Sequence, residues 1–414
     1  MWIWPPGALT PVVAGRLDRD EAIVTFTYGR SYLGRPDAIA LYLPELPLRR
    51  GPIGPLFGEA AGCILDSAPD AWGQRVILHR HTSGRGLDPA ELDLFTYLLE
   101  SGSDRIGALD FQVSSSEYRG RQTAGSLDQL VAAAQMVQDG VPLPDELDRA
   151  LVHGSSVGGA RPKALLHDRG RSLIAKFSST TDIYPVVKGE YLAMELARLA
   201  GLSTASVELV ESLSRDVLLI ERFDRPPGGG RRAMVSALTM LELDEWSGRY
   251  ASYADLAELI RHRFGDPDAT LRELFARITF NILVGNNDDH ARNHAAFWDG
   301  TRLDLTPAYD ITPTPRSGRT SRQAMSIGTD GWRWSQLGGC VERAPIYHLR
   351  IEEAREIIDH QIDTIAGEWD AACDRARLTR ADRNFFWRRQ FLNPFAFEDY
   401  EAPAAIAVGG AKDG

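Results

Sequence analysis

Cysteine is scarce in this chain: its 414 residues include only Cys63, Cys340 and Cys373. They are far apart and lack metal-ligand spacing, which excludes a disulfide framework or a cysteine zinc site and fits a reducing compartment. No apolar run approaches the roughly 18–20 residues of a membrane span. The start, Met-Trp-Ile-Trp-Pro-Pro, has no basic region followed by an apolar signal core. We therefore expect a soluble cytoplasmic protein with no membrane association.

An excess of basic residues is also lacking, because the formal net charge is −11. This argues against a protein whose main task is to coat nucleic acid, although a local basic patch stays open. Internal repeats are absent as well. The length exceeds the roughly 250–300 residues of a single core, so two or three subdomains are expected.

Composition and turn signals predict four segments along the chain. The predicted segments are an N-terminal subdomain over 1–115, a nucleotide-binding lobe over 116–243, a helical lobe over 244–400 and a disordered tail over 401–414. A polar stretch containing glycine and serine, Ser114–Gly125, separates the first two.

Local patterns predict the elements within these segments. Strands are expected at Ile23–Tyr28, Ile39–Leu43, Ser172–Phe177 and Asp216–Glu221. Helices are expected after Pro69, from Asp88 to Glu100, from Ser126 (capped with Gln129) to about Gly140, from Lys188 to Ala200, from a capping box at Thr270–Glu273 to Gly285, and within Tyr347–Phe397.

A glycine-bearing turn, Gly154–Ala160, precedes the strand that ends at Phe177. Its backbone is free enough to bring amide groups close to a phosphate. It nearly matches a Walker A loop, but Ala160-Arg161 replaces the required Lys-Ser/Thr, so a P-loop NTPase is disfavoured. A mobile glycine linker is the alternative interpretation.

Lys176 lies on the strand Ser172–Phe177 and points to the same face as Ile174. Glu190 follows fourteen residues later on the next predicted helix. Taken singly, such residues are most often surface charges. Together, a strand lysine and a helix glutamate match the phosphate-positioning pair of a kinase lobe. Glu221-Arg222-Phe223-Asp224-Arg225 then reads as a hinge whose backbone could meet an adenine edge.

The densest run of chemically capable side chains is Gly285–Asn293, which reads Gly-Asn-Asn-Asp-Asp-His-Ala-Arg-Asn. Protein kinases place a catalytic aspartate five residues before a metal-binding asparagine and a second metal-binding aspartate after a hairpin. Asp288, Asn293 and Asp310 have this order. Asp288 fits the base, and Asn293 with Asp310 fits Mg²⁺, which prefers oxygen ligands. Asp289, beside Asp288, competes for the base role.

A hairpin turn at Asp299-Gly300 connects this run to Asp310. With Trp298 facing Thr301, the register places Asn293 opposite Thr306. Asp310 then returns near Asn293.

His290 either orients the loop by hydrogen bonding, which we favour, or transfers a proton. Arg292 either neutralises phosphate charge or is solvated. A metal hydrolase using Asp288, Asp289, His290 and His294 is a further alternative, which the strand position of His294 disfavours.

Several ordered motifs resemble the HipA family of serine/threonine kinases, the toxins of bacterial toxin–antitoxin pairs. The matching stretches are Ser155–Leu165, Ala175–Phe177, Glu221–Arg225, Gly285–Asn293 and Pro307–Asp310, and Tyr28–Pro69 is similar to the family's small N-terminal subdomain. The resemblance implies an α+β, two-lobed, protein-kinase-like fold with a mixed α/β N-terminal subdomain and a helical C-terminal lobe.

The resemblance also implies an ATP- and Mg²⁺-dependent enzyme. Asp288 would be the base, with His290 in the catalytic set, and Asn293 and Asp310 would hold the metal. The implied nucleotide contacts are Ser155, Val157, Gly158, Lys163, Lys176, Glu221, Phe223, Asp288, His290, Asn293 and Asp310. Ser156 occupies the autophosphorylation position, and phosphorylation there would eject the loop. Ser155 beside it leaves the acceptor open.

Two departures from the family pattern occur in the loop. Asp289 stands where a glycine is often found, and Asn287 replaces a common threonine. Neither departure removes a ligand that the proposed chemistry requires.

The implied partners are a small helix-turn-helix antitoxin similar to HipB, DNA only through that antitoxin, and a protein substrate such as an aminoacyl-tRNA synthetase. Whether the chain forms a homodimer is left open. The alternative function is a weakly active, kinase-like binding module that acts mainly as a co-repressor with the antitoxin.

Overall fold

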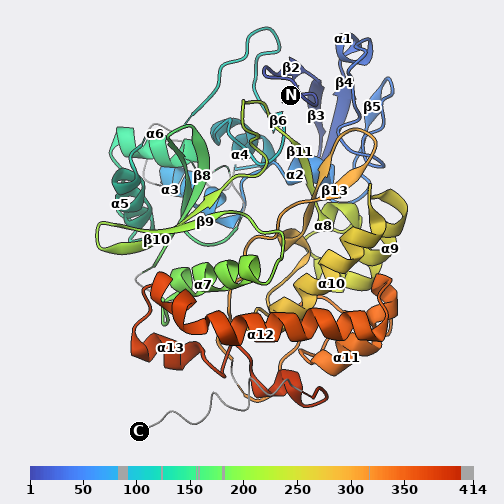
Figure 1. Ribbon diagram of the computed structural model, residues 1–414. Coiled ribbons are helices and arrows are strands. Elements are labelled where there is room, and N and C mark those ends of the chain that lie inside the picture. Colours follow the sequence, from blue (N-terminus) through green and yellow to red (C-terminus); the bar gives the residue numbers. More distant parts are fainter. Residues whose placement is uncertain are drawn as a thin grey trace. The chain divides into compact units, whose positions relative to one another are not determined.

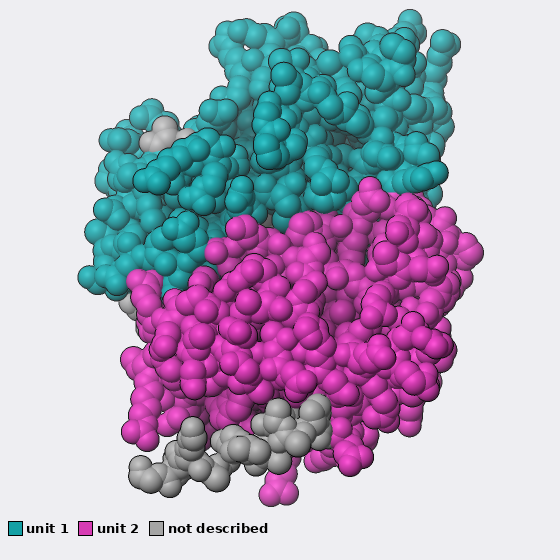
Figure 2. Space-filling view, viewed as in Figure 1, with its two compact units in different colours: residues 1–181, 208–244, 296–302 teal, residues 182–207, 245–295, 303–414 magenta. Residues whose placement is uncertain are grey.

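The computed structural model describes residues 1–82, 92–122, 125–154, 156, 159–179, 182–316 and 318–401. Two compact units emerge, coloured separately in Figure 2. Unit 1 comprises residues 1–181, 208–244 and 296–302, and unit 2 comprises residues 182–207, 245–295 and 303–414. Each unit draws on separated stretches of sequence. The predicted segment boundaries near residues 115, 243 and 400 stay predictions.

Unit 1 carries most of the strands (Figure 1). Its elements are β1 (Trp2–Ile3), β2 (Val12–Val13), β3 (Gly15–Asp20), β4 (Ile23–Tyr28), α1 (Arg30–Leu33), β5 (Pro52–Ile53), α2 (Gly62–Leu65), α3 (Ala71–Arg80), α4 (Leu94–Glu100), β6 (Leu109–Asp110), α5 (Leu127–Gln138), α6 (Asp145–Gly154), β7 (Lys163–Asp168), β8 (Arg171–Phe177), most of β9 (Val207–Ser212), β10 (Arg215–Glu221), β11 (Ala233–Ser236), α8 (Ala237–Met240) and most of β12 (Ala295–Trp298).

The largest sheet of unit 1 has the strand order β7-β8-β10-β9, and β8 is antiparallel to both β7 and β10. Because side chains alternate across a strand, Leu173, Ala175 and Phe177 share one face of β8. They join a buried apolar core with residues of α3, α5 and α6, including Trp72 and Leu130. Lys176 therefore points to the opposite face, as the sequence predicts.

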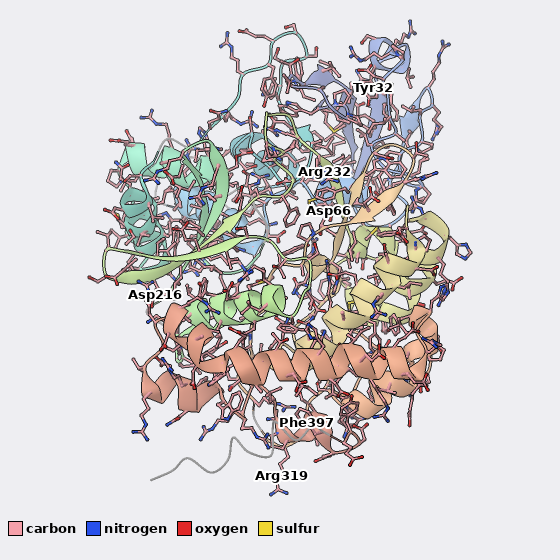
Figure 3. The ribbon with its side chains drawn as sticks, in the orientation of Figure 1. Tyr32, Asp66, Asp216, Arg232, Arg319 and Phe397 are labelled. Carbon is pink, nitrogen blue, oxygen red and sulfur yellow. The ribbon has the colours of Figure 1, made fainter. Side chains whose placement is uncertain are left out.

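In the N-terminal part of unit 1, one stretch predicted to be a strand is held by hydrogen bonds to tyrosine side chains. Ile23–Tyr28 forms β4, which pairs with β3 and β5. The prediction of a strand at Ile39–Leu43 is wrong, because no strand forms there. The hydroxyls of Tyr28 and Tyr32 instead bond this stretch: Leu41 N–H donates to Tyr28 at 2.9 Å, and Tyr32, labelled in Figure 3, donates to the carbonyl of Ile39 at 2.9 Å.

Two helix starts in unit 1 can be compared with the sequence. Ser126 and Gln129 form the predicted capping box at the start of α5. The helix expected from Asp88 to Glu100 is α4, which begins at Leu94 with Asp93 as its cap. The predicted start at Asp88–Glu91 lies outside the described residues, as does the predicted tail beyond Glu401.

Unit 2 is mainly helical. Its elements are α7 (Val186–Leu199), η3 (Gly248–Tyr250), α9 (Tyr253–Arg263), α10 (Pro267–Val284), η4 (Ala291–Asn293), β13 (Leu303–Leu305), α11 (Leu337–Glu342), η5 (Ala344–Tyr347), α12 (Ile351–Arg375), α13 (Arg380–Phe386) and η6 (Pro394–Phe397). The long α12 runs alongside α7 and α10 (Figure 1).

The helix α10 leads directly into the run Gly285–Asn293. It begins at Pro267, with Asp266 accepting from Ala269 N–H at 3.2 Å, so the predicted capping box at Thr270–Glu273 is wrong. An acceptor followed by proline at the first helical position is the stronger start signal. Thr270 lies inside the helix, where its hydroxyl donates to the carbonyl of Asp266 at 2.6 Å.

Candidate active site

Gly285 ends α10 and turns the chain into the candidate catalytic loop, Gly285–Asn293. Its φ of +71° lies in the left-handed region that favours glycine. A Cβ at this position would also lie 2.8 Å from the carbonyl oxygen of Gln390. The carbonyl of Gly285 accepts from the hydroxyl of Thr314 at 2.9 Å. Both conformation and close approach therefore require glycine here.

Burial alternates along the middle of the loop. Asp288 and His290 are exposed, whereas Asp289 and Ala291 are buried. The two adjacent aspartates, which the sequence leaves as competitors for one role, thus occupy opposite environments. Asp288 is the carboxylate that a substrate in solvent can reach.

Asn293 folds back onto the loop that precedes it. Its backbone N–H donates to the carbonyl of His290 at 2.8 Å, and its side-chain nitrogen donates to the carbonyl of Asp288 at 3.3 Å. Since the amide nitrogen is used in this way, the amide oxygen is the atom suited to a hard cation such as Mg²⁺.

Asp289 is held by three side-chain donors: the hydroxyl of Tyr253, the Nδ2 of Asn281 at 2.8 Å and the Nε2 of His294 at 2.8 Å. Burial acts to raise the pKa of Asp289, but the nearby imidazole of His294 and the hydrogen bonds from His294 and Tyr253 outweigh it and lower that pKa. We call these four residues the Asp289 cluster. No local sequence signal groups these four residues or connects Tyr253 to the loop.

Asp310 is half-buried and has a φ of +61°, a left-handed conformation that is uncommon for residues other than glycine and that aspartate adopts more readily than most. The neighbouring Tyr309 donates its hydroxyl to the carbonyl of Arg292 at 2.7 Å. This bond joins the segment that carries Asp310 to the loop that carries Asp288.

The predicted hairpin register is wrong. Asp299 N–H donates to the carbonyl of Arg302 at 3.4 Å, and Thr306 N–H donates to the carbonyl of Ala295 at 3.0 Å. Ala295, not Asn293, is therefore opposite Thr306, and the turn is centred on Gly300-Thr301. The carboxylate of Asp299 accepts from the N–H groups of Thr301 and Arg302, both at 2.7 Å, which accounts for the shift.

Asn287 and Arg292 are engaged within unit 2. The side-chain nitrogen of Asn287 donates to Ser321 at 3.2 Å, and its oxygen accepts from Thr314. Arg292 forms an ion pair with Glu245.

Lys163 and Lys176 of unit 1 are cross-strand partners on β7 and β8, on the face opposite the apolar core. They are 5% and 8% exposed, respectively. The sheet therefore presents two buried lysine side chains next to each other on this face.

The glycine loop of unit 1 is described at Ser156 and from Gly159 onward. Ser156 is 1% exposed, and its hydroxyl donates to the carbonyl of Asp104 at 3.3 Å. Gly159 has a φ of +110°, and its N–H donates to the carboxylate of Asp70. The predicted nucleotide contacts Ser155, Val157 and Gly158 lie outside the described residues.

The hinge segment Glu221–Arg225 contains a buried ionic group that the sequence analysis missed. Glu221, the last residue of β10, is exposed. Arg222 bonds Asp224 at 2.8 Å and Asp104 at 3.0 Å, and Arg225 bonds the same two carboxylates at 2.9 and 2.7 Å. We call Asp104, Arg222, Asp224 and Arg225 the arginine cluster.

Within the arginine cluster, burial acts to raise the pKa of Asp104 and of Asp224. The charges of Arg222 and Arg225 outweigh burial: they hold the pKa of Asp104 well below its ordinary range and lower the pKa of Asp224. The carbonyl of Asp104 accepts from Arg222 at 2.9 Å as well as from Ser156. The cluster thus connects the hinge segment to the glycine loop.

Phe223 is the half-buried member of the hinge segment. Its ring meets that of Phe297 edge-on, with centroids 5.8 Å apart. The guanidinium carbon of Arg232, labelled in Figure 3, lies 3.2 Å from the centroid of the Phe297 ring. Aromatic and cationic contacts thus fix the end of the hinge.

Among the residues that the structure describes, no group of three or more His, Cys, Asp or Glu side chains is placed so that it could hold a metal ion. His294 of the alternative hydrolase set is bonded to Asp289 instead. No described helix is both long enough and apolar enough to cross a membrane.

Known proteins resemble the chain in fold. HipA of the Shewanella oneidensis MR-1 toxin–antitoxin system, solved together with HipB and its operator DNA, superposes with a TM-score of 0.68 at 19% identity, covering 94% of this chain and 95% of that one. The fold is therefore the mixed α+β fold of HipA, as the sequence predicts.

Family models agree with the fold. The HipA-like C-terminal domain matches residues 155–369, more than half of the chain, and the HipA N-terminal domain matches residues 8–112. The chain belongs to the HipA family, which confirms the predicted resemblance.

Curated relatives carry kinase names. The putative kinase Y4mE of Sinorhizobium fredii is 29% identical over 180 residues, covering 39% of this chain and 41% of the relative. The serine/threonine-protein kinase toxin HipA of Shewanella oneidensis is 26% identical over 183 residues, covering 38% and 42%. The matches thus span about two-fifths of the relatives' length.

Proposed function

We propose that this chain is an ATP- and Mg²⁺-dependent serine/threonine protein kinase and the toxin of a bacterial toxin–antitoxin module. The observation that carries the proposal is that two adjacent aspartates have different environments. Asp288 is exposed, and Asp289 is withdrawn into a hydrogen-bonded cluster. Membership in a family whose relatives are named kinases supports it.

In unit 2, Asp288 accepts the proton of the attacking hydroxyl, and the exposed His290 assists as an orienting or proton-carrying residue. The amide oxygen of Asn293 and the carboxylate of Asp310 fit Mg²⁺, because both are hard oxygen donors. When bound, the metal would neutralise charge on the phosphates of ATP.

In unit 1, Lys163 and Lys176 supply positive charge for the phosphates of ATP. Ser155, Val157 and Gly158 belong to the same nucleotide site by family resemblance. Glu221 and Phe223 form the adenine hinge, where the aromatic contacts of Phe223 favour one conformation.

Phosphate transfer from radiolabelled Mg-ATP tests the activity. Asp288→Asn should lower the rate by roughly 100- to 10,000-fold, the range for a positioned general base. Asp310→Asn should abolish magnesium-dependent transfer. Asp304→Asn, an exposed carboxylate on β13, is the matched control and should retain the wild-type rate. Absence of transfer by the wild-type chain to itself and to every lysate protein would rule out the kinase proposal.

Autophosphorylation on Ser156, or on the adjacent Ser155, is part of the proposal. A phosphate on Ser156 does not fit its buried setting against Asp104, so the glycine loop would have to leave its site. Mass spectrometry after incubation with Mg-ATP should find one phosphate on the peptide Gly154–Lys163. Ser156→Ala and Ser155→Ala distinguish the two acceptors.

The proposed partners are a small helix-turn-helix antitoxin, DNA reached only through it, and a translation-related substrate such as an aminoacyl-tRNA synthetase, all in the cytoplasm. The S. oneidensis HipA was solved with HipB and operator DNA, which favours a second role as co-repressor. Gel retardation with an antitoxin encoded beside this chain tests that role. Asp288→Asn should retain DNA in the complex although it lacks transfer.

A further inference from the structure

We propose that Asp289 is a positioning residue that fixes the catalytic loop so that Asp288 faces the substrate. This inference deepens the proposed function and rests on it, because the orientation has value only if Asp288 acts on a substrate. The two carboxylates are adjacent in sequence, and only their surroundings distinguish them.

Asp289 accepts hydrogen bonds from side chains in three parts of unit 2. Tyr253 opens α9, Asn281 lies in the last turn of α10, and His294 follows the loop. All three side chains and Asp289 itself are buried, at 3% exposure or less. A carboxylate has acceptor sites enough for three such donors, and each bond restrains the loop from a different direction.

The donors are themselves held in place. Asn281 accepts on its side-chain oxygen from the Nδ2 of Asn286 at 3.0 Å, so the first part of the loop joins the same network. The ring of Tyr253 meets the ring of His294 edge-on, with centroids 5.6 Å apart. Because the partner of the Nε2 of His294 is a carboxylate, which only accepts, Nε2 is the atom that carries the hydrogen toward Asp289.

The consequence for Asp288 follows from backbone geometry. Side chains alternate along residues 288–291. Asp289 and Ala291 point inward, so Asp288 and His290 point outward. Asn293 then reaches the carbonyl of Asp288, which brings the proposed metal ligand to the proposed base. Releasing Asp289 would let this arrangement fluctuate, and a displacement of about 1 Å at a reacting group reduces rates by about 100-fold.

Asp289→Asn tests the inference, because it keeps the shape and removes the charge that binds three donors. We expect kcat to fall roughly 10- to 100-fold, the range for residues that orient catalytic groups. KM for ATP should change less than about threefold, and the pH at which the rate begins to rise should stay where it is in the wild type.

A second measurement does not depend on activity. Hydrogen exchange of the backbone amides over residues 286–294 should become at least tenfold faster in Asp289→Asn. Tyr253→Phe should give a smaller effect of the same kind. His294→Gln, whose amide can still donate, should recover part of what His294→Leu loses. Glu258→Gln, on the exposed side of α9, is the control and should leave loop exchange and kcat unchanged.

The outcomes separate this inference from the kinase proposal. If the wild-type chain transfers no phosphate, the kinase proposal fails, and loop exchange still decides the role of Asp289. If exchange and kcat of Asp289→Asn both equal those of the wild type, Asp289 does not position the loop. If Asp289→Asn removes all activity and shifts the rising part of the pH profile while Asp288→Asn stays active, the two aspartates have the opposite roles.

Discussion

The arginine cluster of unit 1 and the Asp289 cluster of unit 2 hold buried carboxylates by different means. In the former, Asp104 and Asp224 are paired with the guanidinium groups of Arg222 and Arg225. In the latter, one carboxylate receives bonds from a phenol, an amide and an imidazole. Removing one partner of a buried ion pair leaves an uncompensated charge, which costs more than the loss of one of several hydrogen bonds to a carboxylate.

The two kinds of cluster suit different places in the protein. The arginine cluster connects stretches of unit 1 that are about 120 residues apart in sequence, which favours strong pairing. The Asp289 cluster lies beside a group proposed to react, where three donors from different parts of unit 2 restrain the loop. The arginine cluster should therefore matter most for stability and the Asp289 cluster for activity.

The largest expected effect on stability comes from Arg222→Met. It leaves Asp104 and Asp224 with one guanidinium instead of two, and breaking a buried ion pair typically costs about 3–5 kcal/mol of unfolding free energy. Denaturant titration followed by far-UV circular dichroism measures it. Arg16→Met, which removes an exposed pair with Asp18, is the control. A loss below about 1 kcal/mol would contradict the importance of the cluster.

Acid should destabilise unit 1 through the same carboxylates. The folded pKa values of Asp104 and Asp224 lie below the unfolded value of about 3.9. Their stabilisation is therefore complete above that pH and is lost as the pH falls further, by up to about 1.4 kcal/mol per pH unit for each group. Thermal melts between pH 5 and pH 2.5 should fall more steeply for the wild type than for Arg222→Met. Equal slopes would show that the carboxylates are not paired.

The Asp289 cluster should contribute less to stability. Asp289→Asn removes charge-assisted acceptance from donors that stay buried, so we expect unfolding free energy to fall by about 1–3 kcal/mol. The same titration measures it. A loss larger than that of Arg222→Met would reverse the ranking of the two clusters.

The smallest effect is expected at the exposed partner of Arg292. Glu245 is 70% exposed, and such surface ion pairs contribute about 0–1 kcal/mol. Glu245→Gln should therefore change the melting temperature only slightly. The change should be no larger than the one that 0.5 M salt causes in the wild-type protein. A larger shift would indicate that Glu245 supports the loop.

Much of the candidate site could be predicted from local sequence. The order of Asp288, Asn293 and Asp310, the helix-ending Gly285 and the family resemblance each depend on residues near one another in the chain. The face of β8 that carries Lys176 follows from strand alternation, and the capping box of Ser126 and Gln129 from spacing alone. These features depend on short-range geometry, which sequence patterns encode directly.

Other features depend on partners that are distant in sequence. Asp289 is buried because Tyr253 and Asn281 are positioned by α9 and α10, and the arginine cluster forms because Asp104 lies beside Arg222. The observed hairpin register differs from the predicted one because the carboxylate of Asp299 accepts from the backbone N–H groups of the turn that follows it.

The sequence by itself therefore determined the family, the fold class and which residues are candidates for phosphoryl transfer. Only the tertiary structure decided which of two adjacent aspartates is exposed. The physical reason is that burial and hydrogen bonding of a side chain depend on whatever the fold brings next to it, and neighbours in sequence do not specify that.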